Sequence, residues 1–204
     1  MPHNMNIQTF KDAFDGGTRP NRFIVGGGIY KPAGDGGGEG GSVEQLASAA
    51  NNKQLMVKAA SMPSQTLGIL QVPFRGRFAK LPGDRAYPEW TFTCLDESVS
   101  GSGSLRRKFE LWHQVFNPHA TNIVSDPANI LAGKGEAYTS WTVTQIDMSG
   151  NDLRTVTLHK CWPVEVGAID LSYDTADTLT EFSVTLAYDY LTLGTDTQTA
   201  GGNN

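Results

Sequence analysis

The sequence predicts a mainly β protein of the α+β class, an antiparallel sandwich or barrel-like fold with one main helix. Three patterns carry this prediction. Residues 87–95 alternate apolar and polar side chains, as a half-buried strand does. Residues 138–147 and 153–165 are two strand-like runs around a Ser-Gly-Asn-Asp turn, which is typical of a hairpin. Apolar side chains recur at helical spacing only once over a long stretch, at about 104–117.

The main helix is predicted from a single apolar stripe. Leu105, Phe109, Trp112 and Phe116 stand at positions i, i+4, i+7 and i+11, so they share one face of a helix. Asn117–Pro118 then ends the helix, because the residue before proline avoids the helical conformation.

Two short helices are expected as well. The first spans about residues 6–15, where Asn6 can cap a face made by Ile7, Phe10 and Phe14. The second spans about residues 42–51, because Ser42-x-x-Gln45 has the pattern of a capping box.

The remaining apolar runs are predicted to be strands. In the last one, Phe182, Val184 and Leu186 start a face that Tyr188 and Tyr190 continue. We expect these strands at residues 22–30, 54–60, 65–74, 168–173 and 178–191.

The chain is predicted to hold a single domain over residues 1–194, a length that can bury a full core. Residues 31–52 are expected to be an insertion, a Gly-rich loop followed by the short second helix. The polar tail 195–204 is expected to be flexible.

The two cysteines do not make a disulfide framework. Cys94 shares the phase of Trp90 and Phe92, so a buried free thiol is favoured. No apolar run approaches the ~18 residues that a membrane span needs, and the first residues have no signal-peptide pattern. We therefore expect a protein made in the cytoplasm that does not enter a membrane.

Charge is distributed unevenly along the chain. The net charge is −5, yet all 16 Lys and Arg residues lie within residues 1–160. The chain after Lys160 holds acids and no base. An acidic region repels phosphates, which argues against a nucleic-acid reader. Its acidic side chains are Glu165, Asp170, Asp174, Asp177, Glu181, Asp189 and Asp196.

No set of residues supports catalysis, a cofactor or a metal. Gly36-x-Gly38-x-x-Gly41 lacks the tight strand-to-helix turn and the downstream acid of a dinucleotide site. The four histidines have no Cys or carboxylate at ligand spacing, so hydrogen-bonded or solvated imidazoles are favoured. No Ser/His/Asp or Cys/His arrangement is present, and we expect a protein that is not an enzyme.

The densest basic cluster lies between residues 75 and 85. It is either a solvated face of a strand and turn, or a contact that pairs with the acidic C-terminal third of another copy. For the second interpretation the candidate inter-subunit residues are Arg75, Arg77, Lys80, Asp84 and Arg85.

Five motifs in order resemble the tail-tube protein family of contractile-tailed bacteriophages. They are Phe10-x-x-Ala-Phe14 with Arg19-Pro-Asn-x-Phe23, Gly83-Asp-Arg85 with Glu89-Trp-Thr-Phe-Thr93, Arg107-Lys-Phe-x-x-Trp112, Trp162-Pro-x-x-Val-Gly167, and Phe182-x-Val-Thr-Leu-Ala-Tyr-Asp-Tyr190. The resemblance extends over most of the chain, and the five motifs are spread along it.

The resemblance implies a structural virion protein that self-assembles into stacked six-membered rings. These would form the inner tail tube, through which double-stranded DNA passes during infection without sequence-specific binding. The implied partners are further copies of itself and the tail sheath, baseplate, tape-measure and tail-terminator proteins, with assembly in the host cytoplasm. A basic lumen would retain DNA, so we expect acids to face it: Glu165, Asp170, Asp174, Asp177, Glu181 and Asp189.

Two other functions remain open. One is the inner tube of a phage-derived contractile injection or secretion machine, whose cargo is protein. The other is a monomeric β-sandwich ligand-binding module, which should carry a concave aromatic patch. Trp90, Phe92, Trp141 and Trp162 are instead expected in the core.

Overall fold

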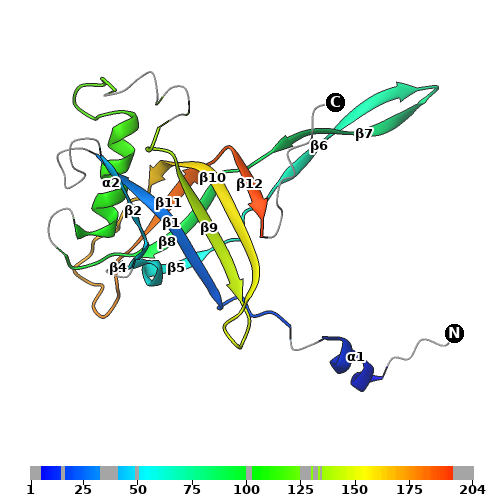
Figure 1. The fold of residues 1–204 in the computed structure, drawn as a ribbon, viewed down its shortest axis with the longest axis horizontal. Helices are drawn as coiled ribbons and strands as arrows, with labels where there is room; N and C mark the ends of the chain where they lie inside the picture. The colour runs from blue at the N-terminus through cyan, green and yellow to red at the C-terminus, as the bar shows by residue number, and fades with distance from the viewer. Residues whose placement is uncertain are drawn as a thin grey trace.

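The computed structural model describes residues 6–14, 17–32, 41–48, 51–99, 103–124, 130, 133 and 135–194. Antiparallel strands dominate it, with a few helices (Figure 1). The elements are α1 (Ile7–Phe14), β1 (Phe23–Lys31), β2 (Ser42–Gln45), β3 (Ala47–Ser48), β4 (Asn51–Asn52), the 3-10 turn η1 (Lys53–Met56), β5 (Val57–Ala60), β6 (Thr66–Phe74), β7 (Arg77–Ala86), β8 (Trp90–Leu95), α2 (Leu105–Phe116), β9 (Thr139–Ile146), β10 (Asp152–Val166), β11 (Glu181–Ala187) and β12 (Tyr190–Leu193).

One continuous set of pairings builds the body, in the order β2-β1-β9-β10-β11-β8-β5, with β12 also beside β10. The 15-residue β10 joins its two halves. Its first part pairs with β9 and β12, and its last part pairs with β11. Between the two parts the register shifts from Leu158 to Cys161, where Lys160 has a φ of +59°. Such a bulge bends a strand, so β10 can pass from one layer to the other.

The two layers meet in an aromatic core around Trp141 of β9. Its ring centroid lies 5.1 Å from that of Phe92 and 6.2 Å from that of Trp90, both on β8. From α2, Phe109 lies 5.9 Å away and Trp112 lies parallel at 6.5 Å. All five side chains are buried, as the sequence predicted for Trp90, Phe92 and the stripe of the main helix.

Each buried indole N–H has a hydrogen-bond acceptor. Trp90 donates to the carbonyl of Ser61, Trp112 to that of Ala137 and Trp141 to that of Gly28. None of these three indoles is therefore buried with an unpaired N–H, and the hydrogen bonds fix the orientation of the rings.

The glycines of β1 allow Trp141 to lie against the backbone. A Cβ built on Gly27 would stand 2.3 Å from Cδ2 of the Trp141 ring. Gly27 and Trp141 are partners in the β1–β9 register, so the missing side chain makes room for the indole on the neighbouring strand. The strand predicted at residues 22–30 is confirmed, with three consecutive glycines inside it.

The helix expected at residues 42–51 is wrong. Residues 42–45 form β2 against β1, from Lys31↔Ser42 to Gly28↔Gln45, and 47–48 pairs with 51–52. Leu46 is buried, and its N–H donates to the carbonyl of Gly27. The capping-box residues are compatible with a helix locally, but the open edge of β1 offers hydrogen bonds and a buried site for Leu46.

Three strand predictions also need correction. Residues 53–56 form η1 instead of extending β5. No strand forms at 168–173, because the chain leaves the sheet at Gly167 and Leu171 and Tyr173 are exposed. The last strand is two strands, β11 and β12, and between them Asp189 donates from its N–H to the carbonyl of His159. This break shifts the phase, so Leu191 is buried and Tyr190 is exposed.

The other elements agree with the prediction. The helices at α1 and α2 and the β9–β10 hairpin form where expected, and Ser104 accepts a hydrogen bond from Arg107 N–H as the cap of α2. Cys94 and Cys161 are both buried and free, and burial raises the pKa of each thiol to about 12. The tail 195–204 and the Gly36–Gly38 motif lie outside the described residues.

A buried ion-pair cluster attaches α2 to β2. Lys108 is almost fully buried and its ammonium donates to the Glu44 carboxylate, which Lys31 approaches at 3.6 Å. Burial alone would raise the pKa of the Glu44 carboxyl, but the hydrogen bond and charge of Lys108, helped by Lys31, hold that pKa below its ordinary value.

Gly27→Ala should destabilise the subunit by about 1–3 kcal/mol, because the added methyl group overlaps the Trp141 ring and the core must shift. Urea unfolding of the unassembled subunit, followed by tryptophan fluorescence, measures this change. Ser140→Ala, at an exposed position beside Trp141, is the matched control and should leave the midpoint unchanged. Equal stability of the two variants would contradict the close packing.

Glu44→Gln should cost roughly 3 kcal/mol at pH 7, because it leaves Lys108 buried without its counter-charge. A carboxyl whose pKa is lowered on folding adds stability above its unfolded pKa and loses it as the pH falls through its folded pKa. The difference in the free energy of unfolding between wild type and Glu44→Gln should therefore narrow below pH 4.5, the ordinary pKa of this carboxyl. Urea unfolding at pH 7 and at acidic pH tests this, with exposed Glu89→Gln as control.

Candidate assembly surfaces

A long β-hairpin made of β6 and β7 projects from the body (Figure 1). We call residues 66–86 the arm. Its strands pair along their whole length, from Phe74↔Arg77 at the tip to Thr66↔Ala86 at the base. Within the described residues the two strands contact chiefly each other. An isolated two-stranded hairpin is only marginally stable in water, so the arm depends on a further surface for its stability.

The tip of the arm is a two-residue turn. Arg75 has a φ of +44° and Gly76 a φ of +80°, the signs of a type I′ turn, which matches the twist of a hairpin. A bulge between Leu67 and Ile69 lies opposite Gly83, and a Cβ on Gly83 would stand 3.0 Å from the Gly68 backbone. The turn, bulge and glycines together fix the register of the arm.

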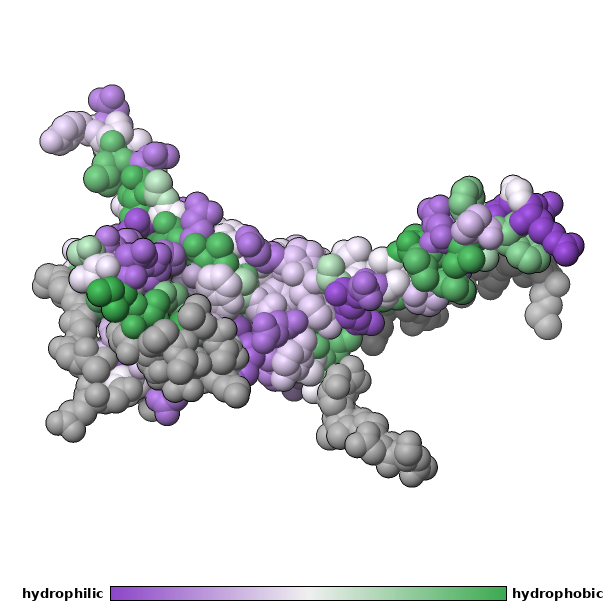
Figure 2. All heavy atoms as spheres, turned by 90° about the horizontal axis from the view of Figure 1, so that it is seen from above, coloured by the Kyte–Doolittle hydropathy of each residue, from purple (hydrophilic) through white to green (hydrophobic). Residues whose placement is uncertain are grey.

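One face of the arm is apolar and exposed. Residues that pair directly across antiparallel strands share a face, so Leu70 with Leu81 and Val72 with Ala79 lie on the same side. Phe74 extends this side to the tip. Leu70, Phe74 and Leu81 are 56%, 65% and 49% exposed. Hydrophobic atoms are visible on the surface of the arm in Figure 2.

A contiguous exposed apolar surface of this kind marks a site of protein interaction. The alternation at residues 70–74 predicts an apolar face, but it carries no information about what covers that face. This exposed surface was therefore not predicted from the sequence.

The five predicted contact residues all lie on the arm. Arg75 is in the turn, with its guanidinium 5.6 Å from the Phe74 ring centroid, and the other four stand on β7. All five are exposed, and within the described residues none takes part in an ion pair. Arg85 at the base donates a hydrogen bond to Gln65. The structure thus gathers them on one projecting strand and turn.

The six acidic lumen candidates do not form one patch. Glu165 and Glu181 lie on the outer face of the β10–β11 pair, together with Thr185, which pairs with Glu165. Asp170, Asp174 and Asp177 lie in the exposed connection 168–180, and Asp189 lies in the break between β11 and β12. Lys58 forms an ion pair with Glu181 and neutralises part of this face, which the base-free stretch of sequence did not reveal.

Hydroxyl groups make up much of the rest of that outer face. Thr91 of β8 lies opposite Thr185 of β11, and their hydroxyls are 3.0 Å apart. Ser183 and Thr93 form the next pair of these two strands on the same face. This surface is polar, and its described residues include no array of bases that would hold a polyanion.

The histidines and cysteines do not form a reaction centre in the described part of the chain. No group of three or more His, Cys, Asp or Glu side chains there could hold a metal ion. His159 stacks on Tyr190 with ring centroids 4.5 Å apart and shares a hydrogen bond with Thr192, so it attaches β12 to β10. Burial lowers the pKa of His159, which favours the neutral form of this imidazole.

Within the described residues, the helices are too short or too polar to cross a membrane.

The fold and the projecting arm are those of a structural assembly protein, and the comparisons with known proteins name the family. The model of the phage tail tube protein family matches residues 38–193. The chain belongs to this family, whose members are structural proteins of the phage tail and not enzymes.

Curated relatives agree with this assignment. Tail tube protein gp19 of Enterobacteria phage T4 is 25% identical over 150 residues, which cover 72% of this chain and 85% of the relative. The tail tube protein of Serratia phage KSP90 is 27% identical over 134 residues, covering 66% and 71%.

Solved structures share the fold. A chain of the tube-terminating cap of the anti-feeding prophage has a TM-score of 0.53 at 16% identity, covering 87% of this chain and 90% of its own. A chain of the sheath-tube complex of the PVC extracellular contractile injection system has a TM-score of 0.51 at 14% identity, covering 93% and 99%. At these identities the likeness shows a common fold.

Val72→Ser on the arm should change the free energy of unfolding of the unassembled subunit by less than ~0.5 kcal/mol, because the side chain is 41% exposed there. Val143→Ser makes the same change at a buried site in β9 and should cost at least ~2 kcal/mol. Urea unfolding compares the two. If Val72→Ser lowers the free energy of unfolding as much as Val143→Ser does, the arm belongs to the core of its own subunit.

Proposed function

We propose that this protein self-assembles into stacked six-membered rings that form the inner tail tube, and that double-stranded DNA passes through this tube during infection. The arm carries the proposal. It exposes an apolar face that its own subunit leaves uncovered, and a second copy of the chain is the partner that membership of a tube family supports.

Contact through the arm is heterologous, since it joins one surface to a different surface on the next copy. Such contacts close into rings or extend into stacks, depending on the rotation between subunits. Within the described residues, β2 and β5 are the two ends of the strand order of the body. Joining the sheets of neighbouring subunits at such edges would remove exposed hydrogen-bonding groups.

Charge supports the head-to-tail arrangement. Arg75, Arg77, Lys80 and Arg85 give the arm a positive charge that Asp84 only partly offsets. We propose that these five residues contact an acidic surface of another copy, and the exposed connection with Asp170, Asp174 and Asp177 is the best candidate. Ion pairs at such a surface contribute orientation more than affinity.

We propose that the outer face of the β10–β11–β8 sheet lines the lumen. Glu165, Glu181 and the threonines of this face would present carboxylates and hydroxyls to the DNA, with one of the charges balanced by Lys58. A wall without exposed arrays of bases does not hold a polyanion, so DNA can slide. The remaining candidates, Asp170, Asp174, Asp177 and Asp189, would lie at the rims of each ring.

The proposed partners are the tail sheath, the baseplate, the tape-measure protein and the tail terminator, with assembly in the host cytoplasm. Solved chains of similar fold come from a baseplate, a sheath and tube terminator, and a sheath-tube complex, which supports the same neighbours here. We further propose that residues 1–194 act as one domain and that 31–52 is an insertion that modifies the contacts of the ring.

A second candidate is the inner tube of a contractile injection machine with a protein cargo. It is favoured by the two fold matches above, which come from such machines. The curated relatives are phage proteins and favour the tail tube. Genes for a capsid and for DNA packaging beside this gene would distinguish the two. A monomeric ligand-binding module is disfavoured, because Trp90, Phe92 and Trp141 are buried and form no aromatic patch. Trp162, which was also expected in the core, is only partly buried.

Negative-stain electron microscopy of the purified protein tests assembly, and the wild type should form rings or tubes. Arg85→Glu should reduce the number of tubes about tenfold or more, since the reversed charge meets the acidic surface of the next copy. Exposed Arg154→Glu on β10 is the matched control and should assemble normally.

Normal tubes from Arg85→Glu would contradict the role of the arm charges, and a strictly monomeric wild type at high concentration would contradict the proposed function. In a map of the tube, the Glu165 and Glu181 carboxylates turned away from the lumen would overturn the assignment of the lumen face.

A further inference from the structure

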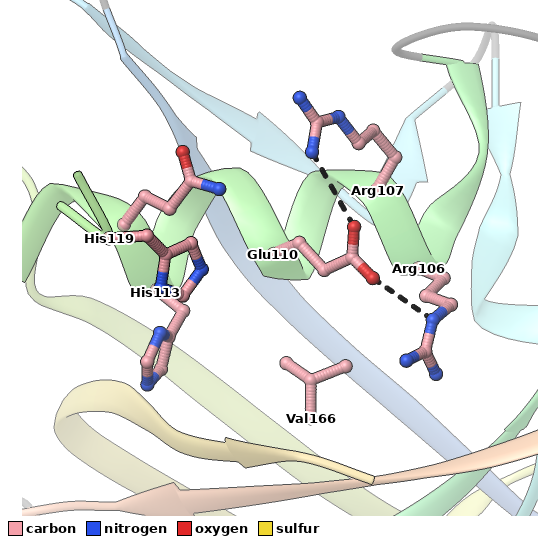
Figure 3. A pocket seen from close by; sticks show the side chains of 7 residues that line it. Arg106, Arg107, Glu110, His113, His119 and Val166 are labelled. Carbon is pink, nitrogen blue, oxygen red and sulfur yellow. Dashed lines mark hydrogen bonds and ion pairs between the residues drawn. The ribbon is translucent and has the colours of Figure 1, made fainter. Parts of the chain in front are cut away.

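A pocket of about 430 Å³ lies on the outer side of α2, away from the aromatic core. Figure 3 shows its side chains along the helix, with Val166 from the end of β10 on the opposite wall. Helix α2 lies at the far end of the body from the arm (Figure 1), so a pocket lined by its side chains is separate from the contact proposed above. It is lined by Arg106, Arg107, Glu110, His113, Gln114, His119 and Val166.

Two guanidinium groups share one carboxylate at the first end of the pocket. Nε of Arg106 lies 3.0 Å from Oε1 of Glu110, and Nη1 of Arg107 lies 3.6 Å from its Oε2 (Figure 3). Arg106 also donates to the carbonyl of Gly167 at 2.7 Å, and its guanidinium stands 5.5 Å from the Phe182 ring. Arg106 is therefore held in place by the fold.

Arg107 differs from Arg106, because its guanidinium makes few contacts within the subunit. Its side chain is 47% exposed, and Glu110 is its one ion-pair partner within the described residues. A guanidinium has five N–H donors, so most donors of Arg107 are available to a ligand.

The second end of the pocket holds two imidazoles. His113 lies one helical turn after Glu110, and His119 comes from the segment after α2. Their rings stack with centroids 6.3 Å apart and an interplanar angle of 29°. Within the described residues neither imidazole, nor the amide of Gln114, makes a hydrogen bond or ion pair with a side chain or backbone group. The pocket therefore presents unused donors at both ends.

Three basic residues lie at the end of α2 where positive charge destabilises a helix. The positive end of the helix dipole is the first turn, which in α2 contains Arg106, Arg107 and Lys108 and no acid. The burial of Lys108 beside Glu44 and the bond from Arg106 to Gly167 explain two of these bases. Within the described residues Arg107 has only the half-exposed ion pair with Glu110, and a residue that breaks a local rule with so little gain in folding is a candidate for binding.

We propose that this pocket binds an oxyanion, namely the carboxylate of an acidic segment on a partner protein that packs against the outer face of α2. The planar guanidinium of Arg107 matches a carboxylate, and the N–H groups of the two imidazoles complete the site. Its volume is far larger than one inorganic anion needs, which favours side chains of a protein segment over free phosphate. Glu110 holds both guanidiniums in position and keeps the empty pocket from accumulating positive charge.

Fluorescence anisotropy tests the proposal with a labelled peptide of alternating Glu and Ser, a matched Gln and Ser peptide, and the full-length subunit. The Glu peptide should bind and the Gln peptide should not. Arg107→Gln should weaken binding about tenfold, the loss expected for a charge-assisted bond. His113→Gln combined with His119→Gln should weaken it similarly, and Arg154→Gln on β10 should have no effect.

Three results would overturn the proposal. The first is equal binding of both peptides, and the second is Glu-peptide binding that survives the Arg107 and histidine substitutions. The third is displacement of the peptide by millimolar inorganic phosphate with loss of all discrimination, which would assign the pocket to a free anion. Circular dichroism confirms that each variant is folded.

The same variants keep this proposal apart from tube formation. Arg107→Gln and the double histidine variant should still form tubes in negative stain, because their side chains are not on the arm. Loss of tubes in these variants would make the pocket a contact between copies of this chain and would overturn the assignment to a partner of another kind.

Discussion

The packing of Trp141 against the backbone of β1 is the constraint on which the rest of this structure depends. The indole takes the space that a side chain on Gly27 would occupy, and its N–H bonds to the next residue, Gly28. It thereby fixes the register of β1 on β9. The rings of Phe92 from the other layer and of Phe109 and Trp112 from α2 then pack on the same indole. Both layers and the helix are thus fixed by a single buried ring.

A body fixed in this way can carry surfaces that are unfavourable for an isolated subunit. The arm leaves Leu70, Phe74 and Leu81 in solvent, where each loses the ~25 cal/mol per Å² that burial would provide. Such a surface is retained when a second molecule covers it. Pro73 and Pro82 in the arm remove hydrogen-bond donors from its edges, which limits random pairing with other strands. The two prolines therefore protect the edges of the arm against pairing with other strands.

Helix α2 serves two surfaces at once. Its buried face supplies Leu105, Phe109 and Trp112 to the core, and Lys108 on its flank is neutralised by Glu44 of β2. Its outer face carries Arg107, His113 and Gln114, which the fold leaves largely unused. Since the core holds the helix rigidly, these outer side chains have a fixed spacing. A tube subunit has to meet unlike partners on different sides, and one rigid helix provides such a surface without any change of shape.

The apolar pattern of the chain was enough to predict the class of fold, the strand faces of β8 and β11, helix α2, the β9–β10 hairpin and the buried thiol of Cys94. In each of these the apolar pattern and the burial agree, because a strand or helix with one apolar face has one way to bury it. Its order of motifs also indicated the tail tube family.

Three features depend on contacts between distant segments. They are the strands within residues 42–52, the shift of side-chain phase in the last strand, and the surface that the arm exposes. Ser42–Gln45 became a strand because the edge of β1 was open to it, and local capping signals carry no information about such a distant edge. Leu70, Val72 and Phe74 form a regular apolar face, yet whether their own core or another molecule covers it depends on where the hairpin points. The pairing of Lys58 with Glu181 likewise joins residues far apart in the chain. These features follow from contacts between distant segments, which no local pattern contains.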